Sequence, residues 1–216
     1  MKYGAIFDMD GVLIDSGEAH RAAWMQLGEE IGVPFGDDMF NHTFGMHNNQ
    51  IVPYWLGRTL PTEERDRLAD RKEELYRKLL PTQARGLPGV VPFIDRLASE
   101  GYGLAVGSSG PMANVRMALE FLGVAKQFRA LSTGEDVQHG KPDPQVFLVA
   151  AERLGLPPSR CVVFEDAPQG VEAGLRGGMR VVAITSSRDR QALSAAHRVI
   201  DGFDELSVAD IESLLA

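Results

Sequence analysis

Two acidic side chains stand two residues apart near the start of the sequence, directly after a short apolar run. Residues 3–7 are long enough for one buried strand, and Asp8 and Asp10 follow them. Gly11 comes next and allows a tight turn that a Cβ atom would hinder. Two neighbouring carboxylates repel each other, which raises the pKa of one of them unless a cation lies between them. The pair therefore predicts either a metal site or two acid/base groups held in different protonation states.

Other uses of such a pair fit this sequence poorly. A calcium-binding EF-hand loop needs oxygen ligands at alternate positions, and Val12 and Ile14 occupy two of those positions here. Sugar-nucleotide transferases also bind a metal through two aspartates with this spacing, but an apolar strand directly before the pair is not typical of them. A solvated loop or a helix cap is the simplest alternative, so the hypothesis of a site depends on the rest of the chain.

Further polar side chains follow predicted strands or lie in the loops between them, and these are Ser108, Ser109, Lys141, Glu165 and Asp166. Ligands bind at the carboxyl ends of strands in an open α/β sheet, so side chains in these places can meet at one edge of the sheet. Each cluster alone is ambiguous, because Gly-Ser-Ser-Gly and Lys-Pro runs occur in ordinary loops. Together, and in this order, they predict one site shared with Asp8 and Asp10.

From residue 89 onward, short apolar strands alternate with helical segments. The expected strands cover residues 103–106, 130–133, 161–164, 181–184 and 199–200. The expected helices cover residues 90–100, 112–122, 144–154 and 168–177. This alternation predicts an α/β fold with a parallel, doubly wound sheet.

A block that carries only helical signals interrupts the α/β pattern before residue 85. Its expected helices begin near residue 17 and cover residues 37–45, 49–56 and 62–80. Ser16 and Thr62 are expected to cap the first and the last of these helices. We therefore predict a core domain of residues 1–16 and 85–216, with an inserted α-helical cap domain of residues 17–84.

The run 7–16, Phe-Asp-Met-Asp-Gly-Val-Leu-Ile-Asp-Ser, resembles the first motif of the haloacid-dehalogenase-like (HAD) phosphohydrolases. In that family the first aspartate of the motif is the nucleophile and the second is the general acid/base, which implies these roles for Asp8 and Asp10. The other family motifs match in the same order at Ser108, Lys141, Glu165 and Asp166. The resemblance covers essentially the whole chain, and the second aspartate separates it from the haloacid dehalogenases themselves, which lack that residue.

The resemblance implies a phosphoryl-transfer site built around Mg²⁺. Phosphoryl transfer needs charge to be neutralised around the moving group, and Mg²⁺ prefers hard oxygen ligands. The implied metal ligands are Asp8, Glu165 and Asp166, with the backbone carbonyl of Asp10. The implied phosphate-binding groups are the Ser108 hydroxyl, the Ser109 N–H and the Lys141 ammonium. Asp8 would attack phosphorus and form an aspartyl-phosphate.

The segment 18–24 is very similar to the hinge and first cap helix of β-phosphoglucomutase-type members of the family. The resemblance implies that the cap closes over the core through hinges at residues 15–17 and 81–86, and that His20 contributes to the substrate site. Lys78 resembles a cap lysine of the mutase group and is a second candidate phosphate contact. A packing role for His20 and a surface role for Lys78 are the alternatives.

Three functions are weighed against each other. The leading one is a Mg²⁺-dependent phosphatase of a small phosphorylated metabolite, with a sugar phosphate as the expected substrate. The alternative is β-phosphoglucomutase, an isomerase on the same scaffold. Asn48 falls where that enzyme has an arginine for a second phosphate, which favours the phosphatase. The third is a non-enzymatic receiver domain phosphorylated on Asp, but its acceptor lies on a middle strand and it has no inserted helical block.

The composition limits the partners and the location of the protein. The chain has 30 acidic and 22 basic side chains, and its net charge of −8 argues against nucleic acid as a main partner. It has no apolar run near the ~18 residues of a membrane span, and its first apolar run is too short for a signal peptide. Its single cysteine, Cys161, cannot form an internal disulfide. We expect a cytoplasmic protein that is a monomer or a weak homo-oligomer.

Overall fold

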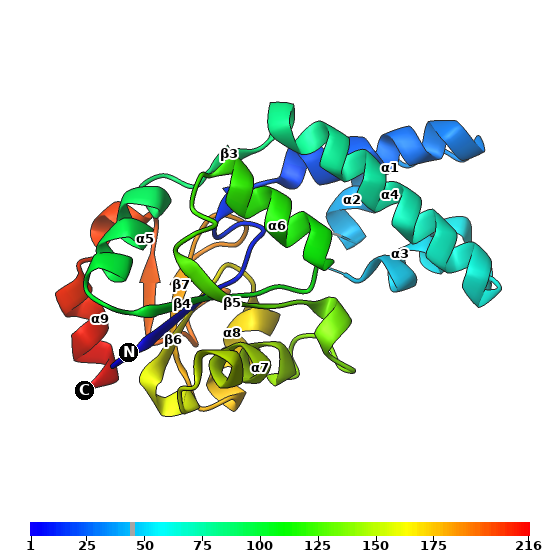
Figure 1. Cartoon of the computed structure of the whole chain (residues 1–216). Coiled ribbons are helices and arrows are strands. Elements are labelled where there is room, and N and C mark those ends of the chain that lie inside the picture. The colour runs from blue at the N-terminus through cyan, green and yellow to red at the C-terminus, as the bar shows by residue number, and fades with distance from the viewer. Residues whose placement is uncertain (44–45) are drawn as a thin grey trace. The chain divides into compact units, whose positions relative to one another are not determined.

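A computed structural model describes residues 1–43 and 46–216 of the chain (Figure 1). Its contacts group the chain into two compact units. The core unit consists of Met1–Asp15 and Arg85–Ala216, and the helical unit consists of Ser16–Ala84. These bounds differ from the predicted ones by one residue, at the first boundary.

The core unit is built on a six-stranded parallel sheet with the strand order β5-β4-β1-β6-β7-β8. In this order the strands are β5 (Phe128–Ser132), β4 (Gly103–Gly107), β1 (Gly4–Phe7), β6 (Cys161–Glu165), β7 (Arg180–Ile184) and β8 (Arg198–Ile200). The first strand of the chain therefore lies in the middle of the sheet. Phe7, its last residue, is level with Val106 of β4 and Phe164 of β6. The carboxyl ends of these three strands consequently lie side by side.

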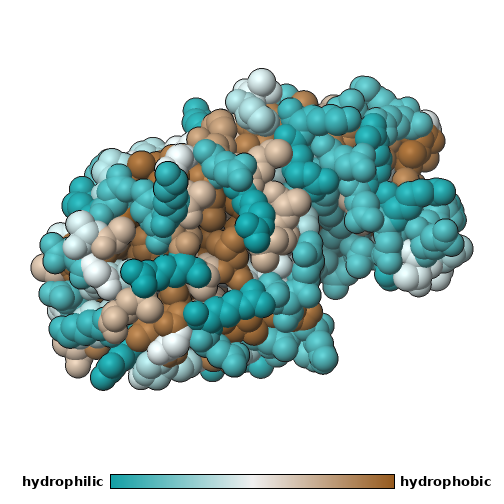
Figure 2. All heavy atoms as spheres, in the orientation of Figure 1, coloured by the Kyte–Doolittle hydropathy of each residue, from teal (hydrophilic) through white to brown (hydrophobic). Residues whose placement is uncertain are grey.

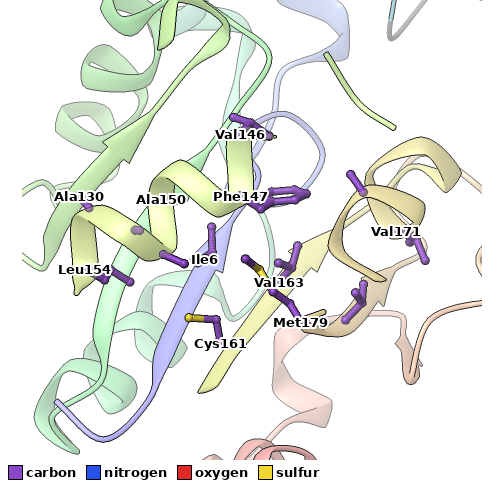
Figure 3. Close-up of a cluster of buried hydrophobic side chains, with 14 of the residues drawn as sticks. Ile6, Ala130, Val146, Phe147, Ala150, Leu154, Cys161, Val163, Val171 and Met179 are labelled. Atoms are coloured by element: carbon purple, nitrogen blue, oxygen red, sulfur yellow. The ribbon is translucent and has the colours of Figure 1, made fainter. Parts of the chain in front are cut away.

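One face of the sheet packs against two helices, α7 (Gln145–Leu154) and α8 (Pro168–Arg176). Figure 3 shows the apolar cluster on this face, in which Ile6 and Val163 of the sheet lie among side chains such as Phe147 of α7 and Val171 of α8. These side chains are fully buried or nearly so. Burying a large aliphatic or aromatic side chain contributes about 1.5–3 kcal/mol, so this cluster is a main source of the core unit's stability.

The opposite face carries an aromatic cluster. The elements that pack on this face are α5 (Val90–Ser99), α6 (Met112–Phe121), the short 3₁₀ helix η3 (Phe203–Glu205) and α9 (Val208–Leu215). Phe7 stacks on Phe164 with ring centroids 4.5 Å apart, and Phe93 of α5 meets Phe164 edge-on at 5.6 Å. Successive residues of a strand point to opposite faces, which is why Ile6 and Phe7 belong to different clusters. Helices on both faces of a parallel sheet confirm the predicted doubly wound α/β class.

In the helical unit, the described residues form four helices around an aromatic centre. They are α1 (Gly17–Ile31), α2 (Asp37–Thr43), α3 (Asn48–Leu56) and α4 (Thr62–Gln83). Trp24 stacks on Phe35 at 5.1 Å, and Trp55 meets the Trp24 ring edge-on at 5.9 Å. The Trp55 indole N–H donates to the backbone oxygen of Pro34 at 3.0 Å, so the polar atom of this buried ring is satisfied.

Some predicted helix ends differ from the observed ones. Ser16 is the N-cap residue of α1, but its side chain makes no capping hydrogen bond. Thr62 is the first residue inside α4 rather than its cap, because Pro61 occupies the cap position. The same helix continues through Pro81 to Gln83, although proline cannot donate the usual backbone hydrogen bond. The end of the helix predicted at residues 37–45 lies outside the described residues.

Short strands lie in or beside the two predicted hinges, residues 15–17 and 81–86. β2 (Ile14–Asp15) and β3 (Arg85–Gly86) pair in the antiparallel sense, with Ile14 opposite Gly86 and Asp15 opposite Arg85. The Arg85 guanidinium donates to Asp15 Oδ2 from Nε at 3.1 Å and from Nη2 at 3.0 Å. Both ends of the segment that leaves the core unit are therefore held together within the core unit itself.

The helical unit presents a polar surface. Figure 2 shows that the visible face of this unit is mostly hydrophilic, in keeping with the many charged residues of α4. Among the described residues, no helix is both long and apolar enough to cross a lipid bilayer.

Candidate active site

The site begins where the three central strands end. Asp8 directly follows β1, and its backbone N–H donates to the carbonyl of Phe164 at 3.0 Å. Ser108 directly follows β4, and its backbone N–H donates to the carbonyl of Ser132 at 3.0 Å. Glu165 is the last residue of β6. The sheet itself thus brings Asp8, Ser108 and Glu165 to one edge, as the sequence predicted.

Lys141 joins the two central carboxylates from the loop before α7. Its Nζ lies 2.7 Å from Asp8 Oδ1 and 2.6 Å from Glu165 Oε1. Both carboxylates are buried, and the Lys141 side chain is only 10% exposed. The ammonium also lies 4.7 Å from the centroid of the Phe147 ring. Burial by itself lowers the pKa of Lys141, but the two carboxylates outweigh it and raise that pKa above its ordinary value. Lys141 is therefore a fixed positive charge beside Asp8.

The Glu165 carboxylate is held from its other side by the start of α8. Glu165 Oε2 accepts the backbone N–H groups of Asp166 at 2.8 Å and Ala167 at 3.0 Å. Gly170 of α8 leaves the room that this carboxylate needs, since a Cβ atom there would lie 1.8 Å from Glu165 Oε1. The sequence prediction missed Gly170. Its signal is a glycine inside a helix, which costs roughly 1 kcal/mol relative to alanine and so points to a packing constraint.

The turn after Asp10 packs directly on Asp166. Gly11 has φ +73°, a left-handed conformation that other residues rarely adopt, and a Cβ atom there would lie 1.9 Å from Asp166 Oδ2. The Gly11 N–H donates to the carbonyl of Ile14 at 2.8 Å and closes the turn. The first acidic motif and the last one, more than 150 residues apart in the sequence, are therefore neighbours.

Three buried carboxylates of this cluster suit a divalent cation. Asp8, Glu165 and Asp166 offer oxygen atoms that all lie within 4.8 Å of one another. Burial raises the pKa of Asp8 to about 7, although Lys141 opposes the rise, and Glu165 adds to it. Burial also raises the pKa of Asp166 well above its ordinary value, with smaller contributions from Glu165 and Asp8. One lysine cannot neutralise three carboxylates, and hard carboxylate oxygens are the ligands that Mg²⁺ prefers, so the residues fit this metal.

The predicted phosphate-binding serines lie in the loop between β4 and α6. Ser108 is buried, and its Oγ accepts the backbone N–H of Gly110 at 3.1 Å. The Ser108 hydroxyl hydrogen remains available for a phosphate oxygen in this arrangement. Ser109 lies three residues before the first residue of α6, Met112, so its N–H belongs to the loop and not to the helix.

His20 lies in a buried polar cluster of the helical unit. Its ring stacks on Tyr76 at 3.9 Å between centroids, and its Nδ1 lies 2.7 Å from Lys72 Nζ. Lys72 also donates to Glu73 Oε1 at 2.8 Å, and the same oxygen accepts from Asn48 Nδ2 at 2.6 Å. Lys72 and Glu73 are almost fully buried. The lysine associated with His20 is therefore Lys72, which the sequence prediction did not single out.

Lys78 occupies an exposed position on α4 instead. Its charge contributes, after the hydrogen bond and charge of Arg71, to lowering the pKa of Glu30 on α1. An exposed position near Glu30 and Arg71 is typical of a surface lysine on a charged helix. The geometry of the helical unit gives no support to the predicted phosphate contact of Lys78, which stays a hypothesis.

Replacing Lys72 with methionine is expected to destabilise the helical unit by about 3–5 kcal/mol, because removing one partner of a buried ion pair leaves the other charge uncompensated. Lys78→Met is the matched control on the same helix and should change stability by no more than about 0.5 kcal/mol. Urea unfolding followed by circular dichroism measures both. Equal unfolding midpoints for the two variants would contradict the assigned burial of the Lys72–Glu73 pair.

The parallel, doubly wound sheet and the carboxylate–lysine cluster at its strand ends define a Rossmann-like α/β protein with an acidic candidate active site. The family model of the haloacid dehalogenase-like hydrolases matches residues 4–178. The chain belongs to this family, and the resemblance inferred from its motifs is confirmed.

Named relatives extend the comparison. The chain is 34% identical over 213 residues to the chloroplastic 5-amino-6-(5-phospho-D-ribitylamino)uracil phosphatase of Arabidopsis thaliana. The matched region covers 98% of this chain and 57% of the relative. The chain thus spans little more than half of that relative's length. It is 32% identical over 186 residues to the β-phosphoglucomutase of Bacillus subtilis, covering 83% of this chain and 81% of the relative. The solved structure of a HAD hydrolase from Entamoeba histolytica has the same fold, with a TM-score of 0.90, 24% identity and 99% of each chain covered.

Proposed function

We propose that the protein is a Mg²⁺-dependent phosphatase that hydrolyses a small phosphorylated metabolite, with a sugar phosphate as the expected substrate class. The observation that carries the proposal is the position of the Asp8 carboxylate at a strand end, 2.7 Å from Lys141 Nζ and beside two further buried carboxylates. A phosphatase among the relatives supports it. Membership of a hydrolase family sets aside the non-enzymatic receiver domain.

The residues divide the reaction between them. The Asp8 carboxylate attacks phosphorus and forms an aspartyl-phosphate, while the bond from phosphorus to the leaving oxygen breaks and Asp10 protonates that oxygen. Asp10 then takes a proton from water, and the water oxygen attacks the same phosphorus, which releases phosphate and restores Asp8. Lys141 and Ser108 hold the phosphate oxygens. Mg²⁺, held by Asp8, Glu165, Asp166 and the Asp10 carbonyl, would supply positive charge that neutralises the transferring group.

The mutase is the second candidate, because a relative carries that name. A mutase must bind a second phosphate in its cap. Asn48, at the position expected for that contact, donates its amide to Glu73 at 2.6 Å. Burial raises the pKa of Glu73, but Lys72, His20 and Asn48 outweigh it, and the pKa falls below its ordinary value. Glu73 therefore remains a carboxylate, and its charge opposes a phosphate at Asn48.

Hexose and pentitol monophosphates are expected to release phosphate when incubated with the protein and Mg²⁺. A colorimetric phosphate assay over a panel of phosphorylated metabolites measures this activity. A coupled assay with β-glucose 1-phosphate and catalytic bisphosphate measures conversion to glucose 6-phosphate, which should be much slower than hydrolysis. Mutase turnover well above phosphate release would overturn the choice of phosphatase.

The location and the assembly of the protein complete the proposal. We expect it to act in the cytoplasm, as a monomer or a weak homo-oligomer, on a freely diffusing metabolite. The single cysteine and the acidic composition are the observations behind this expectation. Size-exclusion chromatography with light scattering measures the mass of the assembly against the 23.6 kDa of one chain.

A further inference from the structure

The loop after β7 touches both acidic motifs of the site. Ser187 Oγ donates to the backbone carbonyl of Asp166 at 2.9 Å. The neighbouring hydroxyl, Ser186 Oγ, donates to the backbone carbonyl of Gly11. The loop is itself fixed to the next strand, because the Thr185 N–H donates to the carbonyl of Ile200 at 3.0 Å. Neither Ser186 nor Ser187 has a role in the proposed reaction.

The two serine contacts fall where the first and last acidic motifs pack closely against each other. Gly11 and Asp166 pack so closely that a Cβ atom on Gly11 would lie 1.9 Å from Asp166 Oδ2 and 3.2 Å from Ser186 Oγ. Three turns, from the ends of β1, β6 and β7, therefore meet at one point. A shift of any of them would move the Asp166 carboxylate or the carbonyl of Asp10, the residue next to Gly11. Both of these groups are proposed metal ligands.

We propose that Ser186 and Ser187 are positioning residues that hold the Mg²⁺ ligands of the first and last acidic motifs in register. The proposal rests on the proposed function, since it assigns the metal to this cluster. Ser187 fixes the main chain of Asp166, and Ser186 fixes the turn that carries the Asp10 carbonyl. Hydrogen bonds that orient metal ligands typically contribute 10- to 100-fold to metal affinity.

Isothermal titration calorimetry with MgCl₂ tests the proposal without requiring turnover. Ser187→Ala and Ser186→Ala are each expected to raise the Kd for Mg²⁺ about tenfold. Ser187→Thr keeps a hydroxyl and should recover most of the affinity. Ser99→Ala is the matched control, because the Ser99 hydroxyl also donates to a backbone carbonyl, that of Arg96 on α5, but touches neither acidic motif.

The outcomes separate the two proposals. A Kd within twofold of the wild-type value for both alanine variants would overturn the positioning role, provided that circular dichroism shows all proteins folded. A raised Kd that Ser187→Thr does not restore would also overturn it for Ser187, because packing rather than the hydroxyl would then be responsible. A wild-type protein that binds Mg²⁺ but releases no phosphate from any panel member would contradict the proposed function, while the Kd values still decide the role of the serines.

Discussion

Asp8→Asn is expected to abolish phosphate release while the protein stays folded. An amide is a poor nucleophile and carries no charge for the metal, and loss of an enzyme's nucleophile typically lowers kcat by roughly 10⁴- to 10⁶-fold. The amide oxygen of the variant can still accept the hydrogen bond that Lys141 Nζ now gives to Asp8 Oδ1 at 2.7 Å. The carboxylate of Glu165, 2.6 Å from the same ammonium, also keeps its partner. Activity should therefore be lost without loss of the fold.

Asp95→Asn is the matched control for this change. Asp95 lies on α5, and its Oδ1 accepts from Gln127 Nε2 at 2.9 Å, so the same substitution removes a charge from a hydrogen-bonded aspartate outside the site. Phosphate release is compared for both variants at saturating Mg²⁺, and thermal unfolding followed by circular dichroism checks their folds. An Asp8→Asn protein that keeps more than a few per cent of wild-type activity would sink the assignment of Asp8 as nucleophile.

Removing Mg²⁺ with EDTA is expected to stop the reaction completely and reversibly. The proposed metal ligands include three buried carboxylates within 4.8 Å of one another. Lys141 alone cannot compensate their charge while the phosphate is transferred, so the reaction needs the cation. Added MgCl₂ should restore activity and also raise Tm, because a ligand at 100 times its Kd stabilises the folded state by about 2.7 kcal/mol. Full activity in EDTA would contradict the metal-dependent mechanism.

The stabilisation by Mg²⁺ should depend on pH in a definite direction. In the metal-free protein the pKa of Asp8 is raised from 3.8 to about 7, so between these values the folded state holds a proton that the unfolded chain has lost. The stability of the metal-free protein therefore falls as pH rises through this range. Bound Mg²⁺ compensates the ionised carboxylate and removes that loss. The increase in Tm on adding Mg²⁺ should thus be larger at pH 7.5 than at pH 5, as differential scanning calorimetry can measure.

Sequence reasoning predicted the parts of the site that depend on strand order. Asp8, Ser108 and Glu165 each end or directly follow an apolar run, and parallel strands bring such positions to one edge regardless of packing details. The apolar runs were long enough to be recognised as strands. The alternation with helical segments then predicted the doubly wound sheet. The central place of the first strand was not predicted and is seen only in the strand order of the structure.

Residues whose role depends on tertiary packing were not predicted. Lys72 lies in a run of charged residues that is typical of a solvated helix face, and only the packing of α4 against α1 reveals its burial. The serines of the loop after β7 belong to a polar stretch that reads as an ordinary turn. Gly170 is identified only once the Glu165 carboxylate is seen beside it. The two-residue strands β2 and β3 are too short for any periodic pattern to mark them.

The pairing of β2 with β3 means that the segment between these two strands, the helical unit, can be replaced by another segment. Asp15 and Arg85 face each other across an antiparallel ladder, so the chain leaves the sheet domain and returns to it at one point. Two strands paired in this way can be joined by a turn of only two residues such as Asn-Gly. A segment such as Ser16–Ala84 therefore joins β2 to β3 without interrupting the six-stranded sheet. The same junction offers protein engineers a place to graft a different helical segment onto an unchanged core unit.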